Sequence, residues 1–305
     1  MKPSLSCGEQ VALLVKRGLV VSDESMCAEF LAANNYYRFS GYARYFQLAP
    51  HRGDNAFRPD TSFDEIRTIY EADQALRSAL FLPLTRAELL LRTHTAYVIA
   101  SDHGPSGQFL EEDFYTDVTN GGSIVKSCLR DIKRSKERHI LRYRTGDGGT
   151  PDFIGLPVWS AVEAWSFGTL SKCIERGARG ALAATVATSL GVAKAGFASR
   201  VRSLVYLRNR CVHHSRLWHH SVIDAGPTPN NVRFKAKDQF GQFEPRSVLD
   251  VIASLDDVLA RDKDDVLARD KAVEAILPKL AQTWNSDSVF WQGLSHPQNP
   301  CDRQA

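Results

Sequence analysis

Apolar residues recur at helical spacing along most of the chain. Residues 9–17 and 22–33 each show such a pattern, and the turn residue Gly18 follows the first of them. Ser22 or Asp23 can accept hydrogen bonds from the first amide groups of the second segment, as helix N-caps do. The chain is therefore expected to open with two short helices.

The longest periodic stretch covers residues 62–101. Pro83 interrupts it, and because proline removes one helical hydrogen bond, the pattern predicts either one long kinked helix or two helices. Further helices are predicted over residues 123–143, 158–176, 181–190 and 197–214. Gly/Pro-rich loops are predicted at 50–60 and 147–157, and residues 231–243 could form at most one short β-hairpin. The predicted fold class is all-α.

Composition narrows the function only slightly. A chain of 305 residues with 43% hydrophobic content can bury one large core or two modest ones, and a net charge of +3 permits nucleic-acid binding without arguing for it. The six cysteines form no C-x-x-C pair, which favours a reducing, cytoplasmic location over zinc or disulfide chemistry. No apolar run reaches the roughly 18 residues of a membrane span, and no signal peptide is expected.

Two segments could contact RNA. Residues 34–46 combine six aromatic side chains with two arginines; core packing is favoured, and stacking of unpaired bases is the alternative. Residues 126–144 are the densest positive region, in which four cations are expected on nearly one helical face: Arg130, Lys133, Arg134 and Arg138. This face would meet several phosphates, although a solvated helix surface explains it equally well.

An octapeptide, residues 256–263, is repeated without change as 264–271. Eight residues rotate a helix by about 80° beyond two turns, so the two copies cannot present the same face. A tandem duplication that lengthens a solvated helix is the favoured interpretation. Its carboxylates have no His or Cys neighbours in a ligand pattern, and we expect no required metal and no cofactor.

The residues with the most specific chemistry lie in the segment 207–218. On a helix, Arg208 emerges from the apolar stripe, and Asn209 stands one turn before His213, where its amide could orient the imidazole. Cleaving RNA without a metal needs a base, an acid and a cation that holds the phosphate, and His and Arg suit these tasks. One histidine is too few for both proton transfers, so an active dimer is expected.

Four ordered blocks extend this reading into a resemblance: residues 35–42, residues 87–93, residues 157–171 and residues 207–218. Together they resemble abortive-infection proteins of the AbiD/AbiF type, and the last block resembles the R-N-x-x-x-H motif of HEPN ribonucleases. The resemblance implies a bacterial antiphage toxin that cleaves RNA as a homodimer. It also implies that a small non-coding RNA could restrain the toxin.

The resemblance also implies a division of the chain. Residues 1–60 would form an N-terminal helical segment with the aromatic block, 61–220 a HEPN-like helical bundle, and 221–305 a C-terminal helical extension with the repeat.

Several residues are expected to support the motif. Glu88 and Arg92 most simply form an intrahelical ion pair, and the resemblance places them against the motif helix, where Glu163 is a further candidate. His214 and Arg216 are candidate phosphate contacts.

Alternatives to catalysis remain. Arg208 could be a buried arginine bridged to Glu88 or Glu163, with His213 hydrogen-bonded in the core. The chain would then be a non-catalytic RNA-binding module, or a HEPN scaffold or antitoxin that pairs with a nucleotidyltransferase.

Overall fold

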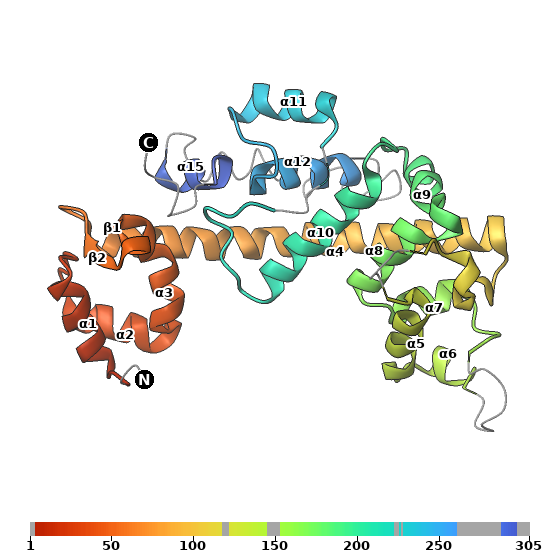
Figure 1. The fold of residues 1–305 in the computed structure, drawn as a ribbon, viewed down its shortest axis with the longest axis horizontal. Coiled ribbons are helices and arrows are strands. Elements are labelled where there is room, and N and C mark those ends of the chain that lie inside the picture. Colours follow the sequence, from red (N-terminus) through yellow and green to blue (C-terminus); the bar gives the residue numbers. More distant parts are fainter. Residues whose placement is uncertain are drawn as a thin grey trace.

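The computed structural model describes residues 4–117, 122–144, 153–222, 226, 228–260 and 288–297. It is mostly helical, which confirms the all-α prediction. Helices gather at both ends and along one side of a single long helix, α4 (Figure 1). Within the described residues, no helix is long and apolar enough to cross a membrane.

Helix α4 (Phe63–His103) is the axis of the molecule. Its 41 residues correspond to a length of about 60 Å at 1.5 Å per residue. The hydroxyl of Ser62 caps its first turn by accepting from the amide of Glu65 at 3.1 Å. Pro83 lies buried inside the helix without ending it, so the one-helix alternative is the correct one. A helix of this length can carry contacts from every other part of the fold.

The N-terminal elements surround the first turns of α4 (Figure 1). They are α1 (Cys7–Lys16), α2 (Glu24–Asn34), α3 (Tyr36–Ala43), β1 (Gln47–Ala49) and β2 (Asp54–Phe57). Of the two predicted N-caps of α2, Ser22 and Asp23, the structure has Asp23, because its carboxylate accepts from the amide of Met26 at 2.9 Å. The antiparallel hairpin β1–β2 pairs Gln47 with Phe57.

This hairpin falls partly in the segment predicted as a loop, residues 50–60. Gly53 at its turn has φ +86°, a conformation that glycine adopts without steric cost. Residues 231–243, where at most a short hairpin was expected, begin instead with a helix, α11 (Asn230–Phe240).

The other end of α4 carries a cluster of shorter helices (Figure 1). They are α5 (Ile124–Arg134), α6 (Arg138–Leu141), α7 (Val158–Ala164), α8 (Phe167–Arg176) and α9 (Leu182–Leu190). Two predicted helices are each divided: 123–143 breaks at Ser135 and 158–176 breaks at Trp165, both of which have extended backbones. Short 3-10 turns complete the described fold: Arg44–Phe46, Pro50–Arg52, Gln108–Leu110, Glu112–Phe114 and Ala178–Gly180.

Helix α10 (Phe197–Val212) crosses α4 and packs against α4, α8 and α12 (Figure 1). The C-terminal helices α11, α12 (Val248–Leu259) and α15 (Val289–Ser295) follow it. Only residues 256–260 of the duplicated octapeptide are described, and the remainder of both copies lies outside the described residues. The buried apolar side chains of the described residues form one continuous cluster that runs from Val11 to Leu294.

Helix α15 docks on the chain that follows α10 through a close backbone approach. The indole Nε1 of Trp218 donates to the carbonyl of Val289 at 3.3 Å, and the amide of His219 donates to the carbonyl of Gly293 at 2.9 Å. A Cβ atom on Gly293 would lie 2.0 Å from Nε1 of Trp218. Only glycine allows this contact.

We expect Gly293→Ala to lower the free energy of unfolding by about 1–3 kcal/mol, because the new methyl group overpacks the Trp218 contact. Urea unfolding measures the change. Gly8→Ala is the control, since Gly8 is exposed in the first turn of α1 and nothing lies within 4 Å of the added atom. Equal stability of the two variants would contradict the close approach.

Candidate functional site

Arg208 lies near the C-terminal end of α10 with a defined orientation. Its Nη2 is 3.1 Å from Oε2 of Glu88, its Nη1 donates to Oδ1 of Asn209 at 3.0 Å, and its guanidinium lies 5.3 Å from the ring centroid of Phe167. The side chain is 25% exposed, and its Nε is buried without a hydrogen-bond partner. An arginine offers five N–H donors, so the paired guanidinium retains donors for a ligand.

Glu88 is shared between two arginines. One carboxylate oxygen binds Arg208, and the other binds Arg92, one turn further along α4. Arg92 is nearly buried and also donates to the carbonyl groups of Val162 and Trp165, at the end of α7. The network thus joins α4, α7 and α10. It contains the guanidinium groups of Arg92 and Arg208 but only the one carboxylate of Glu88.

Glu163 does not join this network. Its side chain is exposed on α7, and no ion pair links it to Arg208. The bridge from Arg208 runs to Glu88 instead.

His213 is the residue that ends α10, and its side chain is exposed. Its amide donates to the carbonyl of Asn209 at 2.9 Å, but no hydrogen bond joins the Asn209 amide to the imidazole within the described residues. Asn209 holds Arg208 rather than His213, which differs from the expected arrangement. The exposed ring also excludes the alternative in which His213 is bonded in the core.

The backbone turns sharply after His213. His214 has φ +54°, an uncommon conformation for a residue with a side chain, and its carbonyl accepts from Arg38 of α3. Arg216 donates to the carbonyl of Gly41 and lies 4.6 Å from the ring centroid of Tyr45. Arg216 therefore binds the aromatic block, whereas we expected it to contact phosphate.

A buried carboxylate holds the next two residues. Asp73 of α4 accepts from the amides of Leu217, at 3.2 Å, and Trp218, at 3.0 Å, and from the hydroxyl of Tyr42 at 2.5 Å. Arg77 forms an ion pair with it one helical turn away. Burial raises the pKa of Asp73, and these donors offset part of that effect.

The sequence reading did not single out Asp73. Its spacing from Ile66, Ile69 and Tyr70 places it on the inward face of α4, and a carboxylate on an inward face is the signal that could have identified it.

A second histidine is paired near the same helix end. The ring of His220 hydrogen-bonds to the hydroxyl of Tyr206, which also accepts from Arg210 at 3.3 Å. Burial, with the charges of Arg210 and Arg216, lowers the pKa of His220 to about 4. His220 is therefore neutral at physiological pH.

The basic segment divides into two parts. Arg130, Lys133 and Arg134 are exposed on α5, while Arg138 begins α6 beyond the break at Ser135. The expectation that all four share one helical face is wrong, because the helix that would align them ends at Arg134. The four side chains are still exposed to solvent.

Residues 29–219 match the model of the family of Abi-like proteins. The chain belongs to this family. The Abi-like match begins within α2 and ends beside Trp218, so it contains Asp73, Glu88, Arg208 and His213 but not α11, α12 or α15. No curated protein and no solved structure matches the chain.

We expect Asp73→Asn to lower the free energy of unfolding by about 3 kcal/mol, because it leaves the buried Arg77 without its counter-charge. Urea unfolding followed by tryptophan fluorescence measures this loss. Glu71→Gln on the same helix is the control: its pair with Arg67 is exposed, so the change should stay below about 1 kcal/mol. Similar losses for both variants would refute the role given to Asp73.

Proposed function

We propose that this Abi-like protein is a metal-independent endoribonuclease toxin of an abortive-infection system. Membership of the family indicates abortive-infection defence. The observation that supports cleavage is the placing of an oriented, partly exposed Arg208 and an exposed His213 at the same end of one helix. The resemblance of the chain to abortive-infection proteins of the AbiD/AbiF type, and of its motif to that of HEPN ribonucleases, supports the same assignment.

Each residue has a defined role in this proposal. Arg208 stabilises the charge that builds on the phosphate, and Glu88 and Asn209 orient its guanidinium before the substrate arrives. His213 takes the proton from the 2′-hydroxyl or gives one to the departing 5′-oxygen, because imidazole titrates near neutral pH. The products then carry 2′,3′-cyclic phosphate and 5′-hydroxyl ends.

A homodimer supplies the second proton-transfer group. Within the same chain, His220 has a low pKa and is bonded to Tyr206, which makes it a poor acid. His213 of a second copy is the better partner, so activity depends on dimerisation. We place this dimer in the cytoplasm.

A non-catalytic RNA-binding module is the second candidate. It is favoured by the exposed cations of α5 and α6, which do not depend on the catalytic pair. Arg130, Lys133, Arg134 and Arg138 would hold the backbone of an RNA substrate, or of a regulatory small non-coding RNA.

We expect Arg208→Ala and His213→Ala each to abolish the growth arrest caused by induction of the wild-type chain. Total RNA is taken from lysates prepared with EDTA, and fragments that end in a 2′,3′-cyclic phosphate are selected and sequenced. Such fragments should be found only with the wild type. Arg202→Ala is the control, because Arg202 is exposed on the same helix and pairs with Glu175 instead. Variants that fold, dimerise and still cleave like the wild type would sink the ribonuclease proposal.

We expect Glu88→Gln to reduce cleavage roughly tenfold, since it weakens the bridge that orients Arg208 by about one charge-assisted hydrogen bond. The decisive readout is a double-mutant cycle. Long incubations of the purified proteins detect residual cleavage far below the level that arrests growth. If Glu88 acts by positioning Arg208, the Glu88→Gln/Arg208→Ala variant then cleaves no more slowly than Arg208→Ala alone. Glu163→Gln is the control and should cleave normally, because Glu163 does not contact Arg208. Additive losses would assign Glu88 a purely structural role.

A further inference from the structure

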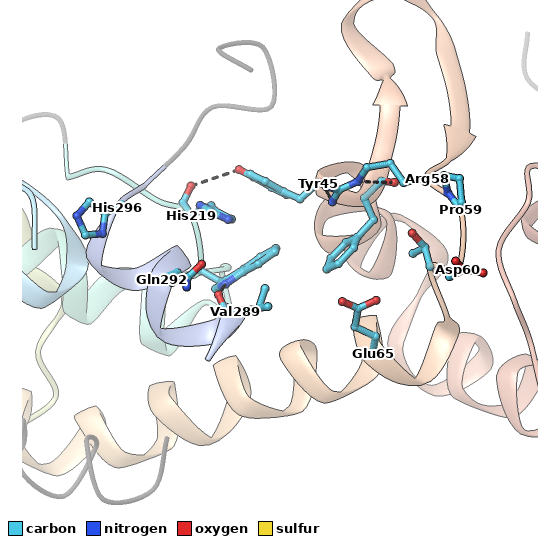
Figure 2. Close-up of a pocket in the computed structure, with 12 residues that line it drawn as sticks. Tyr45, Arg58, Pro59, Asp60, Glu65, His219, Val289, Gln292 and His296 are labelled. Atoms are coloured by element: carbon cyan, nitrogen blue, oxygen red, sulfur yellow. Dashed lines mark hydrogen bonds between the residues drawn. The ribbon is translucent and has the colours of Figure 1, made fainter. Parts of the chain in front are cut away.

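Most of the exposed surface of α4 carries no charge. Near the start of the helix the exposed positions include charged residues such as Glu65, which Figure 2 shows projecting from α4. In the fully described stretch between Glu71 and Asp102, no residue is both exposed and charged. Helix α5, by contrast, exposes Arg130 and Lys133. A helix surface that meets only water is normally polar and charged, so this stretch of α4 is not explained by contact with solvent.

Four large apolar side chains are exposed on this stretch. Phe81 is 55% exposed, Leu82 67%, Leu89 44% and Tyr97 69%. At about 100° per residue, Leu82 and Leu89 lie nearly in line along the helix, and Phe81 and Tyr97 flank that line on opposite sides. We call the surface formed by these four residues the α4 face. Single exposed apolar residues are common on proteins, whereas a cluster of them marks an interaction surface.

The α4 face borders the candidate site. Glu88 follows Phe81 by seven residues, about two turns, so these two side chains lie on one line of α4. Arg208 of α10 binds Glu88 and therefore lies on the same side of α4. Val212 follows Arg208 by about one turn of α10 and is exposed, so apolar surface continues to the residue before His213.

The chemistry of the α4 face selects its partner. A nucleic acid or an anionic membrane would require exposed cations, and this described stretch of α4 exposes none. In a two-fold dimer a surface meets its own copy, so a charge at its centre would be opposed by the same charge. A charge-free apolar surface avoids that repulsion. The α4 face is thus complementary to a second copy of itself.

The size of this surface also suits a small dimer contact. The stretch from Glu71 to Asp102 is about 45 Å long, and a helix with its side chains is about 10 Å wide, which gives about 450 Å² on each copy. A specific interface at the small end of the range needs about 600 Å² on each copy, and the adjoining end of α10 adds to the area. Such a contact should give a dimer with a Kd of about micromolar or tighter.

We propose that the α4 face pairs with the α4 face of a second copy of this chain. The pairing places the second copy beside Glu88 and Arg208, at the site that lacks a second proton-transfer group. This consequence for catalysis rests on the proposed function, whereas the pairing itself does not.

Sedimentation equilibrium of the purified full chain, without RNA, tests the pairing. We expect the wild type to be a dimer, and Leu82→Glu to weaken dimerisation at least about 100-fold, because the new charge lies at the centre of the contact. Leu82→Met conserves volume and apolar character and should stay dimeric. Leu48→Glu is the matched control: Leu48 is a similarly exposed leucine, but it lies on β1 in the N-terminal hairpin.

Circular dichroism checks that Leu82→Glu remains helical, and Leu89→Glu, two turns along the same line, replaces it if it does not fold. A wild type that stays monomeric well above micromolar concentration, dimeric glutamate variants of the α4 face, or a monomeric Leu48→Glu would overturn the proposal. Growth arrest is measured in parallel. A chain that cuts RNA while its Leu82→Glu variant stays dimeric contradicts the α4 pairing alone. A dimeric chain that never cuts RNA, and whose Leu82→Glu variant is monomeric, contradicts the proposed function alone.

Discussion

One buried carboxylate links the separate parts of this molecule. Asp73 lies at the middle of a network whose donors come from α3, from α4 itself and from the chain after α10. An isolated charge at this depth would be costly, so the carboxylate is stable only while all of these donors are in place. It therefore makes the N-terminal helices, the axis helix and the exit from α10 mutually dependent. The direction in which the chain leaves His213 follows from that dependence.

The position of the motif is the result of two such anchors on one helix. Asp73 holds the chain after α10, and Glu88, about four turns further along α4, holds Arg208 within α10. Because α4 is continuous through Pro83, the two anchors keep a constant spacing. The Abi-like match contains both anchors. Helix α15 adds its contact at Trp218, beyond the motif.

Helical periodicity predicted the elements well where a single amphipathic face decides them, as in α1 and α9. It failed where tertiary contacts outweigh local preference. Ser166 begins α8 where the buried Asp131 accepts from its amide, a contact between residues that are distant in the sequence. Residues 231–243 alternate apolar and polar side chains as strands do, yet packing against α12 makes α11 a helix. An ion pair between Arg208 and Glu88 was one of the alternatives that the sequence suggested. The bond from Arg216 to the carbonyl of Gly41 joins residues far apart in the chain, so residue spacing could not have indicated it.

The shared carboxylate has an electrostatic consequence. Glu88 carries one negative charge, while Arg92 and Arg208 carry two positive charges, so the network keeps a net charge of +1 even when every partner is in place. A polyanion can thus be attracted before any contact forms, and without first breaking an ion pair. This attraction acts only within about 8 Å at physiological ionic strength and weakens as salt is added. The rate at which the protein first meets an anionic partner therefore depends on the ionic strength of the solution as well as on the residues that later contact that partner.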